Sequence, residues 1–305
     1  MEEVMQSKVK ENKPGSNSLK NRMTDWIIKL VLFLIALTCV LPFVHVLAKS
    51  LSNEAYVIAQ QVYLYPKGLN FEAYKKVFSD YSIIRSFFVT IFVTFSFTLT
   101  GMILTVCAAY ALSRKHLKGR NVITFLFMFT LYFAGGIIPD YLLMNKLGML
   151  DTIWSIILPL AFSPYNLLIM KTSFQSSLSD SLIESAVIDG ASQFRILRSI
   201  VLPLSKPILA TITLFYAVGR WNAYQDALFY IKQNINIRPL QLKLYYLIAT
   251  STEAVNAAME GTAQYTNPEV LKAACIIFTT LPIICVYPFI QKYFVKGTMI
   301  GAVKG

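Results

Sequence analysis

The chain has 305 residues, of which 55% are hydrophobic and only 14% are charged, and its mean hydropathy is +0.54. Soluble domains carry about 25% charged residues, so this composition excludes an ordinary soluble protein and indicates several membrane spans. The net charge of +12 is interpreted as basic residues that flank the spans on the cytoplasmic side. Because the sequence has no nucleic-acid motif and no interleaving of aromatic and basic residues, we do not expect it to bind nucleic acid.

The first residues of the chain differ in composition from the rest. Residues 1–23 are polar and basic and contain Pro14 and Gly15, so they are expected to form a cytoplasmic tail. Residues 24–305 are expected to form one membrane domain in contact with lipid. Its apolar segments are long enough for a hydrocarbon core of roughly 30 Å. They predict six spans, over residues 26–47, 83–112, 122–143, 152–170, 208–231 and 269–289.

The loop after the second predicted span fixes the expected orientation. It holds a dense basic cluster, Ser113–Arg120, in a short connection, which is typical of the cytoplasmic side of a membrane. Counting spans from this loop places both termini in the cytoplasm. The predicted fold is therefore an all-α polytopic membrane protein with six transmembrane helices.

Two of the predicted spans carry polar residues suited to a transport pathway. Tyr165 and Asn166 follow Pro164 within the fourth span, where a helix break at membrane depth favours lining a cavity; a hydrogen bond between helices is the alternative. The fifth span ends in a polar stretch between Arg220 and Asp226, which are alternatively expected to pair with each other. Aromatic rings stack on pyranose faces, and amides donate and accept hydrogen bonds. The substrate candidates in this stretch are Trp221, Asn222 and Tyr224.

The segment between the fourth and fifth spans is a polar island with helical patterning. Ser181 and Glu184 have the spacing of a capping box, which predicts a helix starting near Leu182. Gly190 is expected to end it, because glycine adopts the left-handed conformation at little cost. A second helix should follow, ended by Pro203 and Pro207. Its predicted apolar stripe comprises Phe194, Leu197 and Val201.

The same island carries a family resemblance. It resembles the E-A-A---G---------I-LP loop in the membrane subunits of bacterial importers of the ATP-binding-cassette (ABC) type, with Ser185 in place of the second-position alanine. The end of the chain, from Gln291 to Gly305, is similar to the carbohydrate-import branch, close to the maltose-type permeases. The residues that match the loop are Glu184, Ser185, Ala186, Asp189, Gly190, Ala191, Ile200, Leu202 and Pro203.

The resemblance implies a function and a set of partners. The chain is expected to be one permease of a carbohydrate importer, in the type-1 transmembrane domain class, with an oligosaccharide favoured as substrate. The implied partners are a second homologous permease, two ATPase subunits that bind ATP and Mg, and an extracellular solute-binding protein. The loop from Glu184 to Pro203 would be the cytoplasmic helix-turn-helix that docks on an ATPase subunit.

Motifs of other chemistry are missing from the sequence. It has no G-x-x-x-x-G-K-[ST], H-E-x-x-H or G-x-S-x-G motif, and it has only two histidines and four cysteines, with no C-x-x-C pair. No catalytic residue, metal site or cofactor is therefore predicted in this chain. The alternatives are an ABC importer for a non-sugar solute and an ion-coupled secondary transporter, which should show inverted repeats and carboxylates inside spans.

Overall fold

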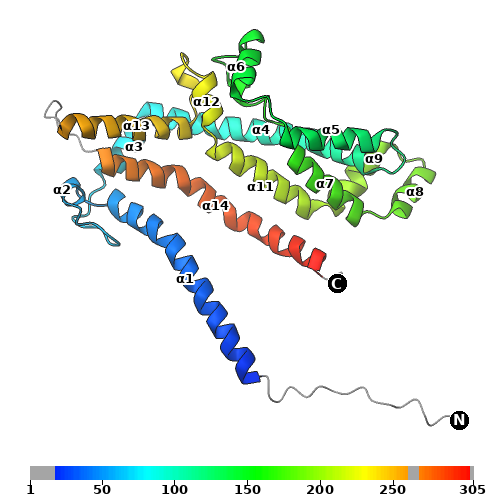
Figure 1. Ribbon diagram of the computed structural model, residues 1–305, viewed down its shortest axis with the longest axis horizontal. Coiled ribbons are helices and arrows are strands. Elements are labelled where there is room, and N and C mark those ends of the chain that lie inside the picture. Colours follow the sequence, from blue (N-terminus) through cyan, green and yellow to red (C-terminus); the bar gives the residue numbers. More distant parts are fainter. Residues whose placement is uncertain (1–17, 260–267, 303–305) are drawn as a thin grey trace.

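The computed structural model describes residues 18–259 and 268–302 as helices joined by short connections (Figure 1). No strand occurs within these two ranges, so the predicted all-α class is confirmed. Residues 1–17 of the predicted tail lie outside the described ranges. The α-helices are α1 (Ser18–Ser50), α2 (Glu54–Ile58), α3 (Glu72–Ser79), α4 (Tyr81–Ser113), α5 (Arg120–Tyr132), α6 (Ile137–Lys146), α7 (Pro164–Ser177), α8 (Asp180–Ile188), α9 (Gln193–Ile196), α10 (Leu202–Leu204), α11 (Lys206–Asn222), α12 (Gln225–Tyr230), α13 (Leu240–Met259) and α14 (Pro268–Ala302). Two 3-10 helices, η1 (Ile153–Ile156) and η3 (Ile235–Ile237), and one π-helix, η2 (Leu197–Val201), complete the described elements.

Three helices are long and apolar enough to cross a membrane as single pieces. They occupy Arg22–Ser50 in α1, Tyr81–Ser113 in α4 and Glu269–Pro288 in α14, and they match the first, second and sixth predicted spans. Two bent pairs meet the same criteria when each pair is taken as one span, which gives up to five in the described residues. The count of six spans stays a prediction.

The other three predicted spans are not straight helices. In the third, α5 and α6 meet at 111° around Gly136, whose φ of +90° favours a residue without a side chain. The fourth contains η1 and an irregular stretch before Pro164 begins α7. The fifth ends its helix at Asn222, and α12 follows as a separate element. Pro164 marks the helix break that the sequence indicated in the fourth span, and Gly136 marks the bend of the third. The fifth was expected to continue to residue 231, but its helix stops at Asn222.

Several helices run side by side, and other helices lie at the two ends of this bundle (Figure 1). In this view α4, α11 and α14 run along the length of the molecule, and α7 packs against α4 and α11. One end carries α8 and α9, and the other carries α2, α3 and α13. The α6 and α12 helices contact each other and project to one side. The end with α8 and α9 is called the motif end below, and the opposite end is called the far end.

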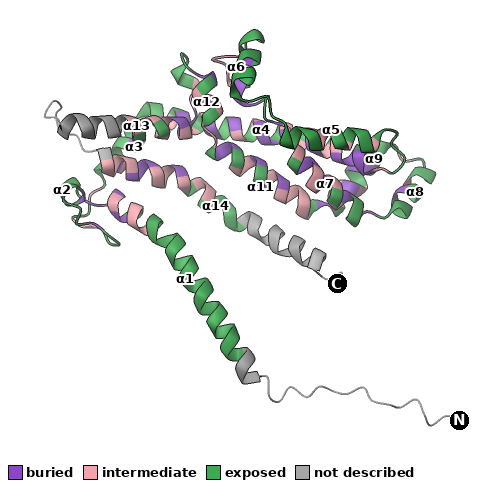
Figure 2. Ribbon diagram, in the orientation of Figure 1, coloured by how far each residue is buried: buried purple, intermediate pink, exposed green. Residues whose placement is uncertain are grey.

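Burial follows this arrangement (Figure 2). The α1 helix is exposed along residues 22–43 and becomes buried only near Ala48. The main core lies between α4, α7, α9 and α11, where apolar side chains from all four helices meet. Its fully buried members are Ala109, Ala161, Leu167, Met170, Phe174, Ile196, Val201 and Ile212. The bundle is thus held together around α4, not around α1.

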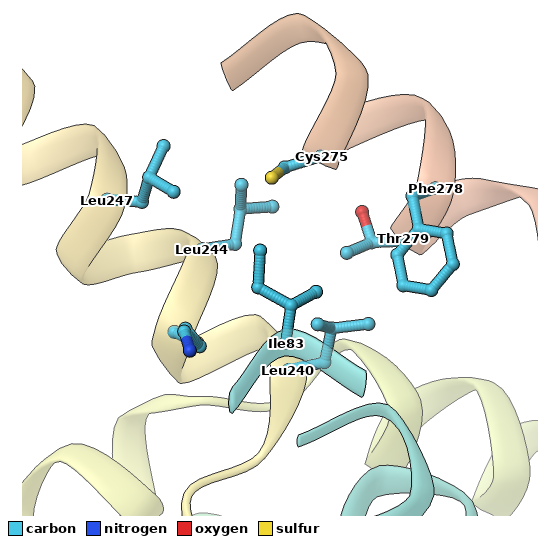
Figure 3. Close-up of a pocket in the computed structure, with 8 residues that line it drawn as sticks. Ile83, Leu240, Leu244, Leu247, Cys275, Phe278 and Thr279 are labelled. Carbon is cyan, nitrogen blue, oxygen red and sulfur yellow. The ribbon is translucent and has the colours of Figure 1, made fainter. Parts of the chain in front are cut away.

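A smaller apolar cluster closes the far end. Figure 3 shows side chains of α4, α13 and α14 that point toward one another around a small pocket. The α13 helix contributes residues of its first turns, from Leu240 onward. The lining residues are Ile83, Leu240, Lys243, Leu244, Leu247, Cys275, Phe278 and Thr279. They pack α13 onto the bundle.

A close approach between elements in the bundle depends on Gly101. A Cβ atom at this buried position of α4 would lie 2.5 Å from the Ala161 carbonyl oxygen and 2.9 Å from the ring of Tyr216. Small residues let helix backbones approach closely in membranes, where van der Waals packing drives association. Gly101 therefore sets the spacing of α4 against α11 and the segment that leads into α7.

We expect Gly101→Ala to destabilise the protein by about 1–3 kcal/mol, because the new methyl group meets backbone as well as a ring. Thermal unfolding of the purified protein in detergent measures the change. Gly219→Ala is the matched control, since a Cβ there meets nothing within 4 Å, and it should be neutral or slightly stabilising. Equal unfolding temperatures for the two variants would contradict the close approach.

Candidate functional site

The polar island forms two helical pieces at the motif end. The first piece, α8, begins at Asp180 and not near Leu182. Its N-cap is Ser179, whose backbone is extended and whose Oγ accepts a hydrogen bond from the Leu182 N–H at 3.4 Å. Ser181 lies inside the helix, so the capping box predicted from Ser181 and Glu184 does not form, because the preceding serine takes the cap.

The turn after α8 has the geometry expected of Gly190. Its φ is +75°, in the left-handed region, and its N–H donates to the Val187 carbonyl at 3.0 Å. The Ala191 N–H donates to the Ala186 carbonyl at 2.9 Å, while Asp189 is the C-cap of the helix. These bonds satisfy carbonyls at the end of α8. The predicted glycine stop is confirmed.

The second piece is a composite of α9, the π-helix η2 and α10. Its buried face comprises Ile196, Leu197 and Val201, which join the main core. Phe194 was expected on this face but is 70% exposed, because α9 turns that side chain away from the core. The chain then bends by 86° between Leu204 and Lys206 to enter α11. Pro203 lies in α10 just before this bend, as the sequence predicts.

The two pieces leave an apolar surface exposed at the motif end. Ile188 is 85% exposed, and Val187 and Leu182 are also exposed beside the charged Glu184. Ser185 is exposed, and its hydroxyl donates back to the Ser181 carbonyl at 2.7 Å. Isolated exposed apolar residues are ordinary, whereas a group of them beside charged residues marks an interaction surface. The name motif surface is used below for Leu182, Glu184, Ser185, Val187, Ile188 and Phe194.

An ion pair joins α8 to the basic loop after α4. Lys115 Nζ lies 2.6 Å from an Asp180 carboxylate oxygen, with both side chains exposed. The hydrogen bond from Lys115 lowers the pKa of the Asp180 carboxyl. A lowered carboxyl pKa means that this contact is present at neutral pH and is lost only when the pH falls through that pKa.

The polar stretch at the end of α11 holds a buried ion pair. Arg220 Nη2 donates to an Asp226 carboxylate oxygen at 2.9 Å, and the two side chains are only 2% and 10% exposed. Arg220 Nη1 also donates to the Ile156 carbonyl at 3.0 Å. The guanidinium carbon lies 5.5 Å from the centre of the Phe97 ring. The pairing that the sequence left open is confirmed, and it joins α4, η1, α11 and α12.

The three substrate candidates in this stretch differ in exposure. Trp221 is buried, and its Nε1–H donates to the Thr279 carbonyl at 3.1 Å. Asn222 is exposed, with its amide bonded to the Val218 carbonyl. Tyr224 is half-buried and stacks on Tyr245 of α13 at 5.0 Å between ring centres. Of the three candidates, Asn222 and Tyr224 are therefore the ones that reach the surface of the chain.

The two candidates of the fourth predicted span lie in the first turn of α7. Tyr165 is 58% exposed and Asn166 is buried. The helix is capped by Ser163, whose Oγ accepts from the Asn166 N–H at 3.3 Å. The structure thus places these candidates on α7 and the others at the end of α11, two helices that contact each other.

A further polar centre was missed in the sequence. Asp151 has a positive φ of +56°, and its Oδ1 accepts the backbone N–H groups of Lys232, Gln233 and Asn234 at 2.7–3.1 Å. Burial raises the pKa of this carboxyl, but the three hydrogen bonds and Arg238 outweigh it and leave the pKa lowered. Asp151 therefore ties the turn before η1 to the turn after α12.

No metal centre is formed by the residues that the structure describes. Among them, no group of three or more His, Cys, Asp or Glu side chains is placed to hold an ion.

Comparison with known proteins assigns the chain. Residues 73–300 match the family described as "Binding-protein-dependent transport system inner membrane component". The chain belongs to this family. It is similar to the polygalacturonan/rhamnogalacturonan transport system permease protein YtcP of Bacillus subtilis (strain 168), with 42% identity over 94% of this chain and 100% of YtcP. It is also 44% identical to the protein LplC of the same organism, over 87% of this chain and 90% of LplC.

A solved structure supports the same assignment. The crystal structure of a bacterial ABC transporter involved in the import of the acidic polysaccharide alginate matches with a TM-score of 0.80 and 36% identity. The match covers 90% of this chain and 98% of that one. The expected family, a permease of an ABC importer and an inner-membrane component of a bacterial transport system, is confirmed, and the alternative of a secondary transporter is not supported.

We expect Asp226→Ala to destabilise this permease by about 3–5 kcal/mol, because it leaves the buried Arg220 guanidinium without its counter-charge. The free energy of unfolding in detergent is the measurement. Lys115→Ala breaks an exposed ion pair and should leave stability nearly unchanged. A loss of stability as large in Lys115→Ala as in Asp226→Ala would show that burial of the Arg220 pair is unimportant.

Proposed function

We propose that this permease is half of the translocation pathway of an ATP-driven importer for acidic oligosaccharides, chains rich in uronic acid. The other half would be a second, homologous permease. Two ATPase subunits would bind ATP and Mg and hydrolyse the nucleotide, and an extracellular binding protein would deliver the sugar. The transmembrane domain would cover residues 24–305, with both termini in the cytoplasm.

The observation that carries the proposal is the motif surface at one end of the bundle. Glu184, Ser185 and Ala186 lie on α8, and Asp189, Gly190 and Ala191 form the turn behind it. Apolar side chains around one carboxylate suit a groove in another protein that offers a basic residue. Pro203 stands just before the bend into α11, so a displacement of this surface passes directly into a long helix.

The substrate class is supported by two similarities and by the chemistry of the chain. YtcP carries the name of a polygalacturonan/rhamnogalacturonan system, and the solved relative takes part in import of alginate. The sugar-facing groups proposed here are Tyr165, Asn222 and Tyr224, because the other two candidates, Asn166 and Trp221, are buried. In the turn after α12, Nζ of the exposed Lys232 lies 5.0 Å from the ring centre of Tyr141 on α6. An aromatic ring beside a cation suits a pyranose that bears a carboxylate.

Reversing the charge of the motif surface should uncouple the complex. We expect Glu184→Lys to lower sugar-stimulated ATP hydrolysis about tenfold, because an attractive contact with a basic groove becomes repulsive. Gly190→Pro should have the same effect, since proline cannot adopt a φ of +75°. Hydrolysis by the co-purified complex in lipid vesicles is the measurement.

The control for this experiment is Glu72→Lys, the same charge reversal at an exposed position on α3 at the far end. It should retain stimulated hydrolysis. Sugar uptake that continues without ATPase subunits and is unaffected by Glu184→Lys would overturn the proposal in favour of an ion-coupled transporter.

Acidic and neutral sugars should be distinguished by the assembled complex. We expect an oligogalacturonide to stimulate ATP hydrolysis, and a malto-oligosaccharide of the same length to leave it near the basal rate. Lys232→Gln should raise the apparent KM for the acidic sugar about two- to fivefold. Lys75→Gln, an exposed lysine of α3, should not. Equal stimulation by both sugars would exclude an acidic oligosaccharide as the specific substrate.

A further inference from the structure

A hydrogen bond between two side chains connects the motif end to α4, in addition to the covalent connection through the backbone. The Tyr110 hydroxyl, near the last turn of α4, donates to Gln193 Oε1 at 2.7 Å. Gln193 is the first residue of α9, directly after the glycine turn, while the Tyr110 ring is buried in the main core. The guanidinium carbon of Arg114 lies 4.7 Å from the centre of that ring. The Tyr110 side chain is thus fixed on one side and bonded to the motif on the other.

A second hydroxyl contact lies further along α4. The buried Thr105 Oγ1 is 2.7 Å from the Tyr216 hydroxyl of α11, and the same hydroxyl accepts the Ser163 N–H at 3.0 Å. Ser163 caps α7, whose first turn holds Tyr165 and Asn166. The Tyr216 ring also packs on Gly101 and on Phe97, whose ring centre is 6.0 Å away. One side chain therefore joins α4 and α11 to the start of α7.

These contacts define a second mechanical route through the molecule. The covalent route runs from α10 through the 86° bend into α11. The other route leaves the motif at Gln193 and enters α4 at Tyr110, and it reaches the start of α7 through Thr105 and Tyr216. Packed helices move as rigid pieces, so a contact at one end of α4 displaces side chains at the other contact.

We propose that Tyr110 and Gln193 are positioning residues that transmit displacement of the motif surface to α4. Tyr216 then passes this displacement on to the first turn of α7. This inference rests on the proposed function, because it requires an ATPase that moves the motif. It assigns the relay to a hydrogen bond between two side chains 83 positions apart.

The test removes the hydrogen bond while it keeps the size of the two side chains nearly the same. We expect Tyr110→Phe and Gln193→Met each to lower the amount of sugar imported per ATP hydrolysed about fivefold. Assembly and basal hydrolysis should be unchanged in Tyr110→Phe, because Tyr110 lies on α4, outside the Glu184–Pro203 loop. Gln193→Glu keeps an oxygen acceptor at the same position and should retain wild-type coupling. The double variant Tyr110→Phe/Gln193→Met should be no worse than either single variant, because both remove one contact.

Uptake and hydrolysis are measured together in vesicles that contain the full complex, with the sugar-loaded binding protein outside. Tyr81→Phe is the matched control, an exposed tyrosine at the opposite end of α4. Wild-type coupling in Tyr110→Phe and Gln193→Met would overturn the relay while leaving the proposed function intact. A loss in Gln193→Glu equal to that in Gln193→Met would also overturn it. No sugar-stimulated hydrolysis by the wild-type complex would overturn the proposed function and the relay together.

Discussion

The architecture depends on one buried ion pair at the point where α11 stops. A helix that ends inside an apolar bundle leaves backbone carbonyls to be satisfied, and irregular segments at that depth have the same need. Arg220 meets part of this need by donating to the Ile156 carbonyl of η1. It also pairs with Asp226 on α12 and faces the Phe97 ring of α4. A single guanidinium therefore allows four elements to meet without a continuous helix.

Around the Arg220–Asp226 ion pair, the helices pack through small and hydroxyl-bearing residues of α4. Gly101 admits Tyr216 and the Ala161 carbonyl, and Thr105 bonds to the Tyr216 hydroxyl. Closer to the far end, Thr90 Oγ1 accepts the Leu240 N–H at 2.7 Å at the start of α13. Lipid supplies no hydrophobic drive between helices, so close approach and internal hydrogen bonds carry the specificity. The α4 helix thus serves as the reference against which the broken segments are placed.

The sequence predicted the features that depend on local chemistry. Long apolar runs identified α1, α4 and α14, and Gly190 identified the turn of the motif, because a left-handed φ is a property of one residue. Hydropathy did not reveal the bends, since a 111° break at Gly136 leaves the average apolarity of a segment unchanged. The wrong cap at Ser181 arose because Ser179 offers the same oxygen two residues earlier.

The partnerships between distant residues were beyond sequence reasoning. Tyr110 and Gln193 are 83 positions apart, and Asp151 accepts N–H groups more than 80 positions away. Their only local signal was a polar group at the edge of an apolar run, which many residues of this chain share. The pairing of Arg220 with Asp226 could be suggested because the two lie six positions apart on either side of a helix end.

Asp151 has a consequence for how this part of the fold can vary in evolution. The excursion between α11 and α13 is pinned at its start by the Arg220–Asp226 pair and after α12 by the Asp151 carboxylate. The entropy of closing a loop grows slowly, by about 0.6 kcal/mol for each doubling of its length. Insertions at the exposed Ile235, which follows the three residues bonded to Asp151, would therefore change little beneath the two pins. The exposed surface of this excursion can therefore diversify while the bundle that supports it stays the same.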